Sequence, residues 1–196
     1  MGNRLEKQIN FLIEVDKMKT VLRQTLLVDK SKRENDAEHS WHFALMAMIL
    51  FEYSDRSEVN ILRVLKMALV HDLIEIYAGD TFAYDEKGNE NKLERETAAA
   101  DKLFSMLPDD QKNEIYSLWL EFDKMETADS KYAAAIDRLQ PFINNYMTEG
   151  HTWKLGNVTS DKVYKRMGMV KEGAPELWDF VVDIVNSSIE KGYLKE

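Results

Sequence analysis

ILRVLKMALVHDLIEIYAG, residues 61–79, is the stretch that most constrains the fold of this chain. Its apolar residues recur at helical spacing and no proline interrupts them, so it predicts one helix that ends at Gly79. The doublet His71-Asp72 lies in the middle of this apolar run. A buried carboxylate without a partner costs roughly several kcal/mol. The doublet therefore indicates a metal ion or another ionic partner at this point of the helix.

The remainder of the chain also favours helices. Prolines and glycines are few, and no segment shows the sustained alternation of a strand. Residues 4–26 predict a first amphipathic helix, and residues 29–35 predict a polar loop. Asp36 is the expected N-cap of a second helix, which is apolar almost all round and should lie centrally. Further helices are predicted near residues 92–106, 109–125, 128–148, 160–171 and 175–192, after a polar loop at 80–91. The expected fold class is all-α.

Composition limits the classes of function. A chain of 196 residues suits one domain, and the absence of cysteine excludes disulfides and thiolate metal sites. The net charge of -9 argues against a nucleic-acid polymer or an anionic membrane as partner. No apolar run approaches the ~18 residues of a membrane span, and the charged N-terminal segment does not resemble a secretory signal. We expect a cytoplasmic protein.

Several polar residues could join the doublet in one site. On the predicted helix, Glu75 shares a face with His71 and Asp72, and Asp80 follows the helix end. A solvated helix face that carries these residue types by chance is the alternative interpretation. His39 lies at the start of the second helix. Asp137 lies among alanines, where it binds either a metal or a neighbouring cation such as Arg138.

The order of these residues resembles a known signature. His39, then His71-Asp72, then Asp137 is similar to the H…HD…D pattern of HD-domain metal-dependent phosphohydrolases. The run Glu38-His39-Ser40 and the pair Gly79-Asp80 resemble more closely the branch that contains 5′-deoxynucleotidases. The resemblance implies a single compact helical HD domain over residues 1–196, with a metal-binding core at about 36–148. It also implies a homodimer.

The resemblance also implies the roles of individual residues. His39, His71, Asp72 and Asp137 would bind one divalent metal ion, and this donor set suits Mn²⁺, Co²⁺, Mg²⁺ or Zn²⁺. Glu75 and Asp80 would be the catalytic carboxylates, and the sequence does not decide which is acid and which is base. The substrate-binding residues would be Arg23, Gln24 and Thr81.

Gln24 departs from the pattern of the deoxynucleotidase branch. That branch has a tryptophan at this position, which is thought to sense the missing hydroxyl of the sugar. A flat apolar ring leaves a 2′-hydroxyl without a hydrogen bond, whereas a glutamine can bind it. The sequence therefore leaves the preference between deoxyribose and ribose open.

Three functions follow from these residues. The first is a phosphohydrolase that removes phosphate from (deoxy)ribonucleoside 5′-monophosphates. The second is an HD hydrolase of another phosphoester, such as a guanosine alarmone or a nucleoside triphosphate. The third is a non-catalytic module that binds metal and nucleotide. Glu75 and Asp80 favour an enzyme, because a site that only binds needs no group to activate water.

Overall fold

The computed structural model describes residues 4–85, 88 and 90–196, and its architecture is all-α, as predicted. A small two-stranded ribbon is the only sheet in this described part. The first half of the chain forms α1 (Arg4–Val15), η1 (Asp16–Thr20), β1 (Leu22–Leu26), β2 (Arg33–Asn35), α2 (Asp36–Ile49), η2 (Phe51–Tyr53), α3 (Ile61–Val70) and α4 (Glu75–Ala78). The second half forms α5 (Lys92–Phe104), α6 (Asp109–Lys124), α7 (Ala128–Met147), α8 (His151–Leu155), α9 (Ser160–Gly173), η3 (Pro175–Leu177) and α10 (Trp178–Glu190).

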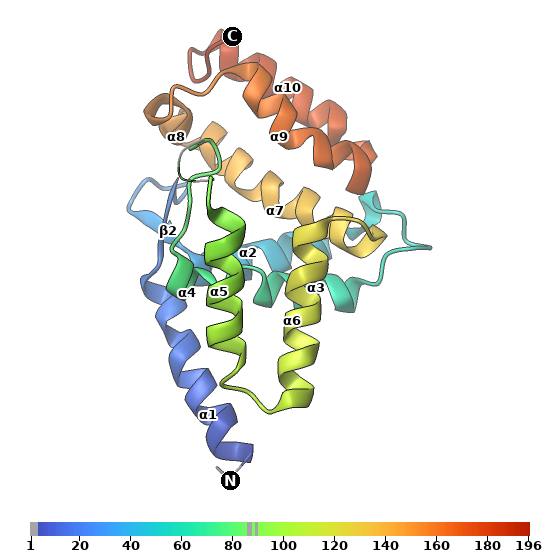
Figure 1. The fold of residues 1–196 in the computed structure, drawn as a ribbon. Helices are drawn as coiled ribbons and strands as arrows, with labels where there is room; N and C mark the ends of the chain where they lie inside the picture. Colours follow the sequence, from blue (N-terminus) through green and yellow to red (C-terminus); the bar gives the residue numbers. More distant parts are fainter. Residues whose placement is uncertain (1–3, 86–87, 89) are drawn as a thin grey trace.

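Helix α7 is the centre of the fold. In Figure 1 it passes between the α9–α10 pair and the group of α1, α5 and α6. Its alanine-rich stretch is buried, as are Ile136 and Leu139, and small side chains let neighbouring helices approach closely. A capping box at Thr127 and Ser130 fixes its start. Because α7 carries Asp137, this predicted ligand lies at the middle of the molecule.

The predicted helix of residues 61–79 is divided into two pieces at the doublet. Helix α3 ends at Val70, four turn residues follow, and α4 begins at Glu75. In the turn, the Leu73 amide bonds the Val70 carbonyl and the Glu75 amide bonds the Asp72 carbonyl, which tightens the backbone. The prediction of one continuous helix is therefore wrong, and Glu75 does not share a regular helical face with the doublet. Gly79 ends α4 at φ +76°, as predicted.

The prediction of a first helix over residues 4–26 is wrong after Val15. Residues Leu22–Leu26 form β1, which pairs antiparallel with β2 through an irregular register. In β1 the Thr25 side chain is buried while Leu22 is exposed, which is the alternation of a strand. The Arg33 side chain donates to the carbonyl of Leu22 at 2.8 Å and also to that of Arg23. This ribbon brings Arg23 to the centre of the molecule.

Helix α2 begins at Asp36, the residue predicted as its N-cap, so its actual N-cap lies one residue earlier. Asn35 is the N-cap and forms a capping box with Glu38, so Asp36 lies in the first turn and is fully buried. One face of α2 packs on the core through Phe43 and Ala47. The opposite face is exposed at Trp41, so only one face of α2 has the central position that was expected of the helix.

The later helices follow the predicted ranges closely. The exceptions are α8, which lies between two predicted helices, and the 3₁₀ turn η3 before α10. Part of the predicted loop 80–91 is described as turns and irregular backbone, and residues 86, 87 and 89 lie outside the described residues. Among the described residues, none forms a helix that is both long and apolar enough to cross a membrane.

Candidate metal centre and its cavity

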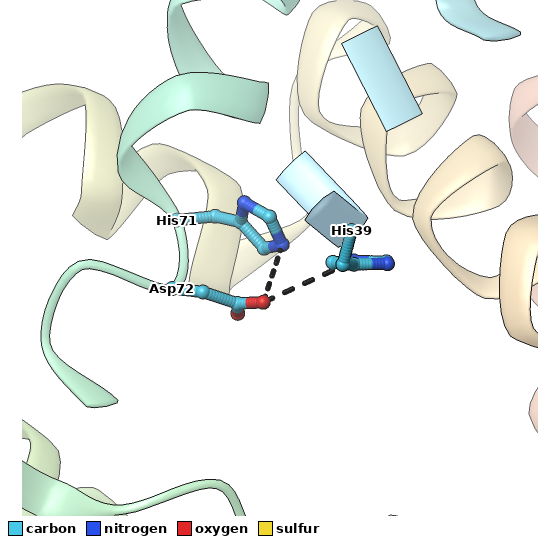
Figure 2. A group of neighbouring side chains, drawn as sticks. All are labelled: His39, His71 and Asp72. Carbon is cyan, nitrogen blue, oxygen red and sulfur yellow. Dashed lines mark ion pairs between the residues drawn. The ribbon is translucent and has the colours of Figure 1, made fainter. Parts of the chain in front are cut away.

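Four predicted metal ligands converge on one point between α2, α7 and the α3–α4 turn. The His39 Nε2 atom lies 2.9 Å from Asp137 Oδ1 and 3.9 Å from Asp72 Oδ2. The His71 Nε2 atom lies 3.1 Å from Asp72 Oδ2 and 3.5 Å from Asp137 Oδ1. Figure 2 shows both imidazole rings directed at the Asp72 carboxylate. Residues separated by about a hundred positions thus form one compact group.

Each histidine presents its Nε2 atom to this group because its Nδ1 atom is bound elsewhere. The His71 Nδ1 atom lies 3.0 Å from the carbonyl oxygen of Ala68, so it must carry a hydrogen and donate it. The His39 Nδ1 atom lies 3.0 Å from Gln140 Oε1, also an acceptor. Metal-binding histidines typically donate their second ring nitrogen in this way. Both Nε2 atoms are therefore directed toward the two aspartates.

A chain of buried hydrogen bonds fixes the orientation of the Gln140 amide. Its Nε2 atom donates to Glu34 Oε1 at 2.6 Å and faces His42 Nδ1 at 3.2 Å. Because the amide nitrogen is used on that side, the Oε1 atom must face His39. Gln140 and His39 are completely buried. Glu34 and Gln140 therefore set which nitrogen of His39 faces the site.

The donor set fits a divalent cation. Donors about 2.1 Å from one ion stand roughly 3.0–3.5 Å from their neighbours, which is close to the spacings found here. The buried His71 Nε2 atom has no hydrogen-bond partner of good geometry among the described residues, although Asp72 is near. A buried nitrogen that lies near two carboxylates without a well-formed hydrogen bond to either suits a cation placed between them. Phe43 and Phe122 pack on the His71 ring and keep water from its sides.

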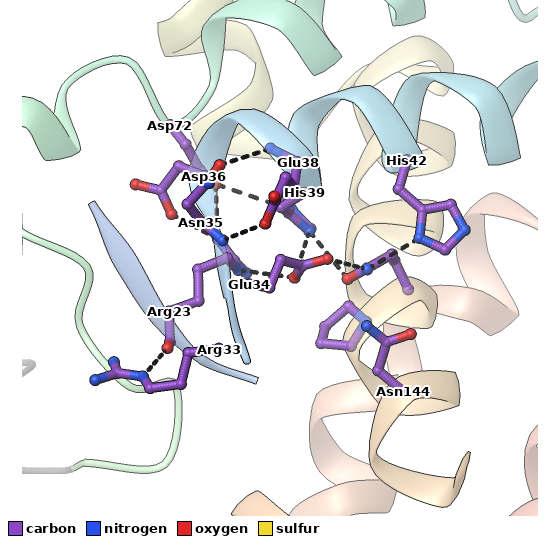
Figure 3. Close-up of polar contacts among 12 residues, drawn as sticks. Arg23, Arg33, Glu34, Asn35, Asp36, Glu38, His39, His42, Asp72 and Asn144 are labelled. Atoms are coloured by element: carbon purple, nitrogen blue, oxygen red, sulfur yellow. Dashed lines mark hydrogen bonds and ion pairs between the residues drawn. The ribbon is translucent and has the colours of Figure 1, made fainter. Parts of the chain in front are cut away.

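Arg23 lies beside the group and is held by three carboxylates (Figure 3). Its Nη1 atom lies 2.8 Å from Asp72 Oδ2 and 3.5 Å from Asp36 Oδ1, and its Nε atom lies 3.6 Å from Glu34 Oε2. Burial alone lowers the pKa of Arg23, but the charges of Asp72 and its neighbours raise it above the ordinary value. The guanidinium therefore stays charged and orients Asp72.

The carboxylates of the site divide into two groups by pKa. Burial works against ionisation of Asp72 and Asp137, but the adjacent histidines lower the pKa of both below the usual range. Burial and the charge of Asp72 raise the pKa of Glu75 well above its ordinary value. Burial also raises the pKa of Asp80, and burial with Asp72 raises that of Asp36 to about 7. The first group suits metal ligation and the second suits proton transfer near neutral pH.

A cavity of about 230 Å³ opens onto this group. Asp72, Asp137 and His71 line it, and so do the two predicted catalytic carboxylates. The predicted substrate residues Arg23, Gln24 and Thr81 are also in its wall. Every predicted site residue lines this cavity except His39, which is fully buried and faces the group with its Nε2 atom.

Residues of the site or its cavity that were not foreseen include Glu34, Asp36, Gln140, Arg166 and Arg138, the last of which was considered only as a partner of Asp137. Asp36 forms a second acidic group with Asp72 and Glu75, and its position before the Glu38-His39-Ser40 run was interpreted as a helix cap. The one signal for Gln140 was its spacing of three residues from Asp137, which places both on nearby faces of α7. Nothing in the sequence pointed to Arg166.

The fold and the site define the class. The chain belongs to the HD domain family, whose pattern matches residues 15–178, and the resemblance inferred from the sequence is confirmed. A solved structure of a predicted metal-dependent phosphohydrolase from Magnetospirillum magnetotacticum MS-1 is 50% identical, with a TM-score of 0.94. The match covers 98% of this chain and 96% of that chain.

Two relatives carry a more specific description. The chain is 32% identical to 5′-deoxynucleotidase HDDC2 of Xenopus laevis, over 67% of this chain and 64% of that protein. It is 31% identical to 5′-deoxynucleotidase HDDC2 of Homo sapiens, over 71% of this chain and 67% of that protein. The matched region thus leaves about a third of each relative's length uncovered.

Proposed function

We propose that this protein is a metal-dependent phosphohydrolase that removes phosphate from nucleoside 5′-monophosphates. The observation that carries the proposal is the convergence of two histidine Nε2 atoms and two ionised aspartates beside two carboxylates of raised pKa. The similarity to proteins described as a metal-dependent phosphohydrolase and as 5′-deoxynucleotidases supports the reaction and the substrate class.

His39, His71, Asp72 and Asp137 would hold the metal ion. Two imidazoles and two carboxylates suit Mn²⁺, Co²⁺, Mg²⁺ or Zn²⁺. When bound, such an ion supplies positive charge to a phosphate oxygen and lowers the pKa of a water molecule. Arg23 keeps the Asp72 carboxylate in place, because its Nη1 atom donates to Asp72 Oδ2. In this role Arg23 positions the metal ligand Asp72, and its charge is balanced by the carboxylates of Glu34, Asp36 and Asp72.

Glu75 and Asp80 would move the protons of the reaction. Both line the cavity, and both have a pKa raised by burial. A carboxylate of raised pKa can take a proton from attacking water, and a protonated one can give a proton to the leaving sugar oxygen. We assign the role of general base to Glu75, because it lies next to the metal ligand Asp72. We assign the role of general acid to Asp80.

Gln24 and Thr81 would contact the nucleoside. Gln24 is exposed at the rim of the cavity, and the Thr81 hydroxyl accepts a hydrogen bond from Arg95 at 3.1 Å. Phe82, Tyr84 and Trp153 form an aromatic part of the cavity wall on which a base can stack. Since Gln24 can bind a sugar hydroxyl, we expect ribonucleotides to be substrates alongside deoxyribonucleotides.

The proposal is tested with a panel of nucleotides and a phosphate-release assay in the presence of each of the four metals. We expect inorganic phosphate from 5′-monophosphates, and its loss in Asp72→Ala but not in Asp183→Ala, an exposed aspartate of α10. Release of diphosphate or triphosphate from longer nucleotides would point to the second function. Binding of nucleotide without turnover in any metal would overturn the proposal.

We also propose that the chain forms a homodimer through the exposed face of α2. Trp41, Leu45, Met48 and Ile49 follow helical spacing and are 65%, 41%, 56% and 67% exposed. Contiguous apolar side chains of this kind mark interaction surfaces. Light scattering on the native chain should give twice the monomer mass, and Trp41→Glu should give the monomer. A native monomer would contradict this part of the proposal.

A further inference from the structure

Two arginines that have no part in the proposed chemistry line the same cavity. Arg138 follows Asp137 on α7, and Arg166 lies on α9. The two helices pack so tightly that a Cβ atom at Gly173 would come within 2.3 Å of the Lys131 carbonyl oxygen. The same pair of packed helices places both arginines in the cavity wall. Both are half-buried.

The guanidinium of Arg138 has unused hydrogen-bond donors. It donates to the Arg166 backbone carbonyl at 3.2 Å and to the Met125 sulfur at 3.0 Å, which is a weak acceptor. A guanidinium has five N–H groups, so several remain available. Within residues 4–85, 88 and 90–196, neither Arg138 nor Arg166 has a carboxylate oxygen within 4.0 Å. The pair therefore forms no close ion pair with a carboxylate in this described part, although the charges of Asp137 and Glu172 act on Arg138 from farther away.

The two positive charges also act on each other. Arg166 repels the positive charge of Arg138, while the carboxylates of Asp137 and Glu172 attract it. The charges of the two arginines also act on the hydroxyl of Tyr84, which lies in the same cavity wall. Burial raises the pKa of its hydroxyl, and both arginines oppose that rise. Half-buried like charges are costly without an anion between or beside them.

Arg23 provides the contrast within the same cavity. Its guanidinium is held by three carboxylates of the metal centre, so its charge is already compensated. Asp72, Glu75 and Asp80 make the wall next to it negative, which disfavours a substrate with more than one phosphate. Arg138 and Arg166 lie in another part of the wall. Their positive charge attracts an anionic group that binds there, away from the metal centre.

We propose that Arg138 and Arg166, with the Tyr84 hydroxyl, form a phosphate-binding subsite in the cavity that is separate from the metal ligands. Planar guanidinium groups bind phosphate through paired N–H donors, and a phenol hydroxyl can donate a further hydrogen bond. The phosphate is either a second phosphate of a nucleotide substrate or free inorganic phosphate that remains as product. This inference rests on the proposed function for the choice of phosphate, but binding at the subsite requires no catalysis.

The first experiment measures binding of inorganic phosphate to the full chain in the presence of a chelator, by calorimetry. Without metal, the subsite is the expected receptor. We expect Arg166→Gln and Arg138→Gln each to weaken phosphate binding about 10- to 100-fold, because each removes charged hydrogen bonds. Lys165→Gln is the matched control, since Lys165 is an exposed cation on the same helix. Arg166→Lys should retain part of the affinity, and near-ultraviolet circular dichroism checks the fold of each variant.

The second experiment identifies the source of the phosphate. With the metal-loaded chain, KM for a 2′-deoxynucleoside 3′,5′-bisphosphate is compared with KM for the 5′-monophosphate. A lower KM for the bisphosphate that disappears in Arg166→Gln assigns the subsite to the substrate. Equal KM values, with weaker product inhibition by phosphate in Arg166→Gln, assign it to free phosphate. If phosphate affinity is the same in the native chain, Arg166→Gln and Lys165→Gln, the subsite does not exist, whether or not the protein hydrolyses nucleotides.

Discussion

Replacement of Gln140 with leucine removes the acceptor of the His39 Nδ1 hydrogen while keeping a side chain of similar size. In the native chain this hydrogen bond, 3.0 Å long and completely buried, holds His39 with Nε2 toward the proposed metal. Leucine would leave the ring free to rotate or to change its protonated nitrogen. It would also leave Glu34 Oε1 without the amide donor at 2.6 Å.

The expected losses of metal affinity and of folding stability follow from these two hydrogen bonds. Loss of a hydrogen-bond partner behind a metal ligand typically costs 10- to 100-fold in metal affinity, or about 1.4–2.7 kcal/mol. Each buried polar group left without a partner costs a further ~1–3 kcal/mol of folding stability. We therefore expect Gln140→Leu to bind Mn²⁺ about 10- to 100-fold more weakly and to unfold at lower temperature. Added metal should restore much of the phosphate release.

Calorimetric titration with Mn²⁺ measures the affinity, and thermal unfolding measures the stability. Thr148→Val is the matched control, because it removes a buried hydroxyl at the end of the same helix, away from the metal centre. The control should lose stability and keep its Mn²⁺ affinity. If Gln140→Leu binds Mn²⁺ as the native chain does, the reasoning that Gln140 sets the His39 ring is refuted.

Three further predictions concern the proposed reaction. Glu75→Gln should lower kcat about 10²- to 10⁴-fold with little change in Mn²⁺ affinity, as expected for a general base, and an unchanged kcat would contradict that role. The carboxylates of Asp72 and Asp137 outweigh the effect of burial and raise the pKa of His71 to about 10. A bound cation must therefore displace a proton below that pH. Mn²⁺ affinity should then rise about tenfold per pH unit between roughly pH 6 and 9, and a flat profile in calorimetry would show that no proton is displaced. Gln24→Trp should raise the ratio of kcat/KM for deoxyribonucleotides over ribonucleotides about tenfold or more, and an unchanged ratio would remove Gln24 from the sugar contact.

The sequence predicted the helices well where an apolar stripe was long and uninterrupted. The alanine-rich stretch around Ile136 and Leu139 is an example, because burial and helix propensity agree there. The ribbon was missed, since Leu22 and its neighbours form a strand only through pairing with Arg33–Asn35, a contact that local periodicity does not record. The break at His71 was missed for a related reason. Its tightened turn depends on contacts of the doublet with other helices.

The group of proposed metal ligands could be predicted because its members are polar residues in apolar settings. His71-Asp72 and Asp137 interrupt runs that are otherwise buried, and the structure places their side chains within a few ångströms of each other. The groups behind them could not be predicted in this way. Gln140 has an ordinary polar side chain on a helix, and its function depends on its contact with His39 from another part of the chain.

The central claim is that one divalent ion held by His39, His71, Asp72 and Asp137 is required for phosphate release. The most direct measurement is a titration of the chelator-treated chain with Mn²⁺, in which release from a 2′-deoxynucleoside 5′-monophosphate is followed at each addition. We predict no release without metal, a rise that saturates near one equivalent, and no rise in Asp137→Asn at the same concentrations. Release that persists in excess chelator, or that Asp137→Asn retains in full, would contradict the account.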